Sequence, residues 1–255
     1  MPLARADLES LLRTRRLDRT LTTALPALDP RDDAAVAPSG VATLDARLGG
    51  GFPRGHVSEL VGARSSGRTS LLLQTIAAAT ARGELVGCVD ALDMLDVASA
   101  DAAGVDSSRL LWVRGHVVTN PGLCGDLNQR ALEQAIRAFT LILQAGNFGL
   151  VVLDLAEAPA QAVRRLPFTT WMRVQRMVEG SQTACLLVGN EPMARSSAGL
   201  TLKLARTGVG DWGLGIRFGE LLFDGFTIQA NVARSRARER EEASVTVSTL
   251  ATDCA

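Results

Sequence analysis

The segment from Gly62 to Ser70, GARSSGRTS, constrains the fold more than any other stretch of the sequence. Its glycines and its threonine have the spacing of a phosphate-binding loop, except that Arg68 stands where that pattern has lysine. Such a loop turns backbone N–H groups toward a phosphate and ends at the positive N-terminus of a helix. The sequence meets this requirement, because an apolar segment at 56–61 precedes the loop and LLLQTIAAATA follows it. A simple strand-to-helix turn is the alternative. The residues predicted to hold phosphate are Gly62, Ser65, Ser66, Gly67, Arg68, Thr69 and Ser70.

The rest of the chain alternates between apolar runs and amphipathic runs. Short apolar segments predict strands at 85–90, 110–113, 150–154 and 184–189, and helical periodicity predicts helices at 126–144 and 161–179. This alternation predicts an α/β fold with a mainly parallel central sheet. After Leu200 the glycine content rises, and alternating runs at 226–232 and 244–248 predict antiparallel strands that extend the sheet.

The N-terminal region is predicted to be separate from this core. Residues 6–24 have leucines on one face of a helix, and the segment that follows is rich in proline and aspartate. We therefore expect an N-terminal helix and linker at 1–39 and a core domain at 40–255. The apolar face of the helix fits either packing on its own core or docking to a partner protein.

Composition limits the classes of partner. The formal net charge is zero and aromatic residues make up 4% of the chain, so nucleic acid would meet no global positive field and few stacking platforms. Four cysteines without a CxxC pair argue against a disulfide framework or zinc site. The charged N-terminus lacks a signal core, and no apolar run has the length of a membrane span. We expect a cytoplasmic protein with no membrane contact, and direct DNA contact stays open.

One substitution and one acidic residue define the expected chemistry. The planar guanidinium of Arg68 is bulkier than the lysine ammonium it replaces, so the terminal phosphate should be poorly aligned. Neutral drift is the alternative, because Lys203 is the single lysine of the chain. Asp154 ends an apolar strand and, with Thr69, is predicted to hold Mg²⁺. The expected cofactor is ATP or ADP with Mg²⁺, bound weakly if at all.

The segment Gly40–Ala79 closely resembles the RecA recombinase family. The likeness continues at Val89–Asp96, Ala103–Leu111, Leu186–Asn190 and Ser196–Lys203, and it implies a RecA-like core. The resemblance implies that Asn190 senses the terminal phosphate and that Asp96 lies near the adenine amino group. It also implies that Arg234 and Arg236 reach the nucleotide of a neighbouring subunit. Leu92 stands at the position of the glutamate that activates water, and Ser99 at that of the residue that stacks on adenine. We therefore expect no catalytic residue, because leucine cannot accept a proton.

Several local stretches resemble a subgroup, the ImuA-type proteins. They are SSGRTSLLL, LILQAGNFGLVVLDL, RRLPFTTWMR and ARSSAGL. The resemblance implies an accessory of the SOS response and of error-prone translesion synthesis. The implied partners are RecA recombinase, an inactive Y-family polymerase-like protein and an error-prone C-family polymerase. Two alternatives remain, namely a divergent DNA-dependent ATPase or recombinase, and a regulator that caps RecA filaments.

Overall fold

The computed structural model describes residues 35–115, 125–206, 225–235 and 244–250. Its main feature is an eight-stranded sheet with the order β10-β9-β8-β3-β7-β6-β4-β5. The strands are β1 (Val36–Ala37), β2 (Phe52–Pro53), β3 (Val57–Gly62), β4 (Val86–Asp90), β5 (Leu110–Arg114), β6 (Leu150–Asp154), β7 (Ala184–Gly189), β8 (Ala198–Arg206), β9 (Gly225–Ser235) and β10 (Ser244–Leu250). The α-helices are α2 (Ala42–Leu48), α3 (Arg68–Ala81), α4 (Val97–Ala102), α5 (Gly125–Ala145), α6 (Ala160–Arg164) and α7 (Phe168–Val178).

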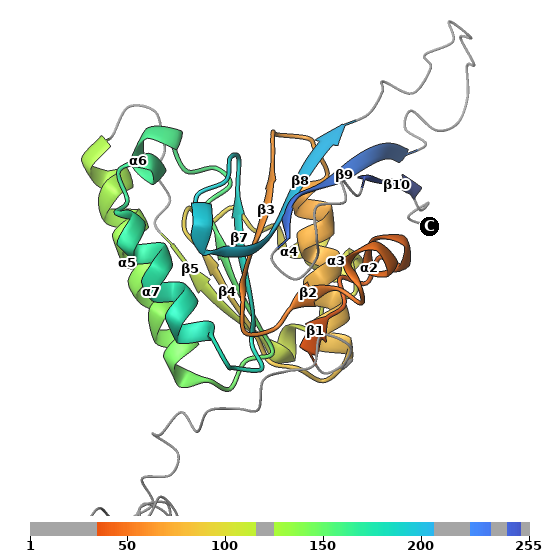
Figure 1. Ribbon diagram of the computed structural model, residues 1–255, viewed down its shortest axis with the longest axis horizontal. Coiled ribbons are helices and arrows are strands. Elements are labelled where there is room, and N and C mark those ends of the chain that lie inside the picture. The colour runs from red at the N-terminus through yellow and green to blue at the C-terminus, as the bar shows by residue number, and fades with distance from the viewer. Residues whose placement is uncertain (1–34, 116–124, 207–224, 236–243, 251–255) are drawn as a thin grey trace, which may run out of the picture.

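The sheet is mainly parallel. From β8 across to β5 every neighbouring pair is parallel, whereas β9 pairs antiparallel with both β8 and β10. Parallel strands need crossover connections, and helices supply them on both faces. Figure 1 shows α5 and α7 on one side of the sheet and α3 with α2 on the other. The predicted fold class, an α/β core with a parallel sheet and antiparallel edge strands, is confirmed.

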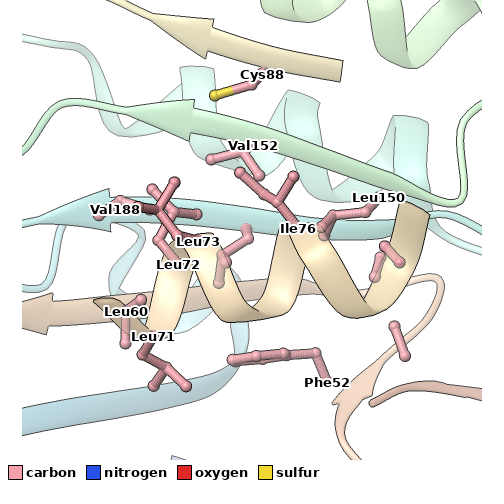
Figure 2. Packing of buried hydrophobic residues seen from close by; sticks show 14 of the residues in the cluster. Phe52, Leu60, Leu71, Leu72, Leu73, Ile76, Cys88, Leu150, Val152 and Val188 are labelled. Carbon is pink, nitrogen blue, oxygen red and sulfur yellow. The ribbon is translucent and has the colours of Figure 1, made fainter. Parts of the chain in front are cut away.

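Two hydrophobic clusters fill the space between sheet and helices. One lies under α3, where Leu72 and Ile76 are buried against Leu60, Val152 and other sheet residues (Figure 2). The other lies under α5 and α7 and includes buried Phe139 and Trp171. The middle strands are buried on both faces, which explains why 150–154 and 184–189 are continuous apolar runs.

One expectation about the elements is wrong. The helix predicted at 161–179 is divided into α6 and α7, because Pro167 lacks an N–H and disfavours helical geometry at Leu166. The antiparallel strands predicted at 226–232 and 244–248 are confirmed as parts of β9 and β10.

The N-terminal boundary is described only in part. The helix predicted at 6–24 lies outside the described residues. Two residues of the predicted linker, Val36 and Ala37, form β1 and pair with β2. None of the helices in the described parts of the chain is long and apolar enough to cross a bilayer.

Candidate nucleotide site

The predicted site residues gather at the edge of the sheet where the parallel strands end. Gly62 ends β3, and the residue before it, Val61, lies opposite Gly189 at the end of β7. Asp154 at the end of β6 lies opposite Asp90 at the end of β4. Ligands of open α/β sheets bind at this edge, because the loops that leave the carboxyl ends of the parallel strands all lie there.

The loop itself has the backbone of a phosphate cradle. Ser65 and Gly67 have positive φ angles of 59° and 83°, and α3 begins directly after them. A side chain at Gly62 would meet Ser66 Oγ and would lie 2.8 Å from the carbonyl oxygen of Leu204, so the close approach of the loop requires glycine there. The first N–H groups of α3 have no partner within the helix and remain available to an anion.

Three hydroxyl groups of the loop are available to a phosphate, two of them exposed and one buried. Thr69 and Ser70 are exposed at the first turn of α3. Ser66 is buried, and its Oγ has no hydrogen-bond partner among the described residues. A buried hydroxyl without a partner is costly, so this atom marks a place where a ligand oxygen fits.

Arg68 does not extend into this cradle. Its side chain is buried, and Nη1 donates to the carbonyl oxygen of Gly62, to that of Gly189 at 3.0 Å and to Asn190 Oδ1 at 2.7 Å. Burial lowers the pKa of Arg68, and the carboxylates of Asp154 and Glu157 oppose this effect. The cation of the loop is therefore bound to the protein itself, where a lysine would offer a point charge to the phosphates.

Sequence reasoning missed Glu157, which lies beside the loop. Its Oε1 is 3.5 Å from Arg68 Nη2, and its Oε2 accepts hydrogen bonds from Arg64, with the Nε of Arg64 at 2.9 Å. Glu157 follows Asp154 by three residues, and no motif draws attention to it. The signal that could have found it is an acidic residue shortly after a strand end that faces a basic loop.

The negatively charged form of Asp154 is unfavourable at the end of β6. The pKa of Asp154 is raised to about 6, mainly by burial and also by the negative charges of Asp90 and Glu157, whereas the backbone N–H of Ala156 and the charge of Arg68 act in the opposite direction. Asp154 Oδ1 accepts that N–H at 2.8 Å. A carboxylate with a raised pKa at the expected Mg²⁺ position is stabilised in its charged form by a cation.

The position expected to activate water cannot do so. Leu92 is 5% exposed and belongs to the hydrophobic cluster under α5 and α7. The adjacent Asp93 has a φ of 59°, and both its oxygens accept hydrogen bonds from Arg114 at 2.7 Å. Asp93 is thus held toward the edge strand β5 and does not replace the missing base.

Among the remaining predicted residues, Asp96 and Asn190 have local hydrogen-bond partners in the structure. Asp96 caps the N-terminus of α4 and accepts from the backbone N–H of Ser99 at 2.8 Å. Asn190 accepts from Arg68 and donates from Nδ2 to the carbonyl oxygen of Ala156 at 2.7 Å. The backbone of Arg234 lies in β9 opposite Thr201, whereas Arg236 lies outside the described residues.

A buried glutamate fixes the segment after β7. Glu59 is fully buried in β3, and its Oε1 accepts the N–H groups of Met193 and Ala194 at 2.6 and 2.7 Å. Its Oε2 accepts the hydroxyl of Thr201 at 2.8 Å. Because three donors converge on one carboxylate, the segment between β7 and β8 is attached firmly to the sheet.

A cavity of about 150 Å³ lies beside Asn190, between α6, α7 and the segment that Glu59 holds. Its apolar lining includes Leu166 and Trp171, and Arg164 and Arg195 border it. Arg164 pairs with Glu191 at 2.6 Å, and the guanidinium of Arg195 lies 5.9 Å from the ring centre of Phe168. A cavity of this size accepts one apolar group about as large as benzene.

The residues present fit phosphate binding better than phosphate transfer. The positive-φ turn, the free N–H groups and the buried hydroxyl of Ser66 suit an anion, and Thr69 with Asp154 offers oxygen ligands that Mg²⁺ prefers. When bound, Mg²⁺ would neutralise charge on the terminal phosphates. In contrast, Arg68 is engaged elsewhere and Leu92 has no proton-accepting group.

A parallel sheet with a phosphate loop after β3 and an acidic strand end in β6 defines the class of P-loop nucleotide-binding proteins. The family model of the RecA N-terminal domain matches residues 24–161, and the chain therefore belongs to this family. It is 38% identical over 131 residues to Protein RecA of Clavibacter michiganensis subsp. michiganensis, a match that covers 51% of this chain and 32% of that protein. Protein RecA of Mycolicibacterium smegmatis is 36% identical over 129 residues, which cover 50% and 33% of the two chains. The match thus spans about a third of the length of these relatives.

Proposed function

We propose that this chain is a RecA-like accessory of the SOS DNA damage response and of error-prone translesion synthesis. It acts through protein contacts, and its ATP hydrolysis is weak or absent. The proposal depends on one observation. Arg68, the cation of the phosphate loop, is bound to Gly189 and Asn190, and the water-activating position is the buried Leu92. Membership of the RecA N-terminal domain family supports a role in DNA repair or recombination.

The groups for ATP hydrolysis are absent from the described part of the chain, but the packed core of the domain is retained. The central strands are buried, and Glu59 keeps the segment after β7 in place. A family core that has lost its turnover residues but keeps its packing retains a surface for other proteins. This combination supports binding as the function rather than hydrolysis.

The proposed partners follow from the resemblance to ImuA-type proteins. They are RecA itself, an inactive Y-family polymerase-like protein and an error-prone C-family polymerase. The cavity beside Asn190, with Leu166 and Trp171 in its lining, suits an apolar side chain, which supports contact with a protein segment. The proposal places the chain in the cytoplasm, where these partners act.

The neutral net charge argues for weak direct contact with DNA. The alternative of a DNA-dependent ATPase or recombinase requires filaments on single-stranded DNA in the presence of ATP. The regulator alternative requires that the chain shorten or cap filaments of RecA. Both are outcomes that electron microscopy of purified proteins distinguishes from the proposed role.

The test combines binding with a cellular readout. Purified full-length chain is used to capture RecA and the two polymerase-type partners, and damage-induced mutation frequency is measured after deletion of the gene. The proposal predicts capture of at least one partner without ATP and a loss of induced mutation. Normal induced mutation in the deletion strain, or DNA-stimulated hydrolysis as fast as that of RecA on the same DNA, contradicts it.

A further inference from the structure

Glu157 acts on both cations of the phosphate loop at once. One carboxylate oxygen accepts from Arg64, and the other lies 3.5 Å from Arg68. The side chain of Glu157 is 22% exposed and that of Arg68 is 5% exposed, so water screens this second pair poorly. A β- or γ-phosphate that enters the loop needs these same cations.

The position of Glu157 is set by the backbone and not by the ion pairs alone. The N–H of Leu155 donates to the carbonyl oxygen of Val188 at 2.9 Å, and that of Ala158 donates to Leu155 at 3.0 Å. The N–H of Ala156 is bound to Asp154, and the carbonyl oxygen of Ala156 accepts from Asn190. The turn that bears Glu157 is therefore attached to both β6 and β7.

We propose that Glu157 sets the nucleotide affinity of this chain by acting as an internal anion that closes the phosphate loop. Its carboxylate occupies Arg64 and places a negative charge beside Arg68, and a nucleoside diphosphate or triphosphate binds only by displacing it. Neutralising Glu157 removes that negative charge from the site and releases the guanidinium of Arg64 to the ligand, while Arg68 stays bound to Gly189 and Asn190. The inference rests on the nucleotide site of the proposed function and not on its protein partners.

An ordinary surface ion pair would behave differently. Arg64 is 79% exposed, and exposed pairs contribute little to stability. Loss of such a pair would leave the nucleotide affinity unchanged. Replacement of Glu157 therefore separates the two roles. An internal anion changes the nucleotide affinity, whereas an ordinary surface ion pair changes at most the free energy of unfolding.

The test is a calorimetric titration of the full chain with ADP and Mg²⁺ at low ionic strength. Glu157→Gln keeps the size of the side chain and removes its charge, and Glu157→Ala removes both. Glu191→Gln is the matched control, because Glu191 also pairs with an arginine of a neighbouring segment, but that arginine, Arg164, is not part of the phosphate loop. Thermal unfolding of each variant verifies that it is folded.

We expect both Glu157 variants to bind ADP at least about tenfold more tightly than the native chain. The control should bind as the native chain does. Unchanged or weaker binding in Glu157→Gln overturns the inference, and so does failure of native chain and variants alike to bind ADP. Capture of RecA by the native chain is measured separately, so a failed affinity test leaves the proposed accessory role standing and a failed capture leaves the affinity result standing.

Discussion

Substitution of Asp154 by asparagine should make the protein more stable at neutral pH. The pKa of Asp154 is raised from 3.8 to about 6, mainly by burial and also by the charges of Asp90 and Glu157. The folded state therefore holds the proton more tightly than the unfolded chain, and ionisation at Asp154 opposes folding. This cost is absent below about pH 4, grows as the pH rises toward 6 and is complete above it.

The magnitude follows from the two pKa values. A pKa of about 6 in place of 3.8 corresponds to about 3 kcal/mol above pH 7. Asp154 is partly exposed, so solvent reduces this figure, and we expect Asp154→Asn to raise the free energy of unfolding by about 1 to 3 kcal/mol at pH 8. Asparagine retains an oxygen for the N–H of Ala156, so that hydrogen bond is preserved.

Urea denaturation in Mg²⁺-free buffer from pH 5 to pH 8 measures the effect. The gain should be about half as large at pH 5 as at pH 8. Asp106→Asn is the control, because hydrogen bonds from Ser108 lower the pKa of that exposed carboxyl, and its loss should give no gain in stability. A destabilised Asp154→Asn protein, or a gain that does not vary with pH, would refute the electrostatic reasoning for this site.

Substitutions at Leu92 with Arg68, and at Glu59, test two other features of the molecule. The double variant Leu92→Glu with Arg68→Lys should show measurable ATP hydrolysis, because it restores a water-activating carboxylate and a point charge for the phosphates. If the native chain already hydrolyses ATP and the double variant is no faster, the site has not lost its catalytic groups. Glu59→Ala should lower the free energy of unfolding by about 3 kcal/mol or more, since two buried N–H groups and the hydroxyl of Thr201 lose their acceptor. Glu59→Gln should cost less than half as much in urea denaturation, and equal losses in the two variants would argue against this role.

Much of the fold could be predicted from the sequence. The runs at 150–154 and 184–189 are strands with the predicted bounds, because strands buried on both faces are apolar throughout. The loop at 62–70 lies between β3 and α3 as its spacing indicates. The division of 161–179 into two helices was missed, because helical periodicity continues across Pro167 and hid the breaker.

The arrangement of charges at the site could not be predicted from the sequence. The sequence shows that Arg68 replaces lysine but not where its guanidinium lies, since Gly189 and Asn190 are far away in the chain and adjacent only in the sheet. Glu157 belongs to no motif, and its importance depends on its distance from Arg64 and Arg68. Such relations arise from tertiary structure, and one sequence cannot reveal them.

We propose that this RecA-family core has lost the groups that cleave ATP. The most direct measurement is steady-state phosphate release by the purified full-length chain with Mg²⁺-ATP, with and without single-stranded DNA, beside RecA under the same conditions. The account predicts that release stays at the level of the Asp154→Asn protein and does not respond to DNA. Turnover that DNA stimulates to the rate of RecA, and that Asp154→Asn abolishes, would contradict it.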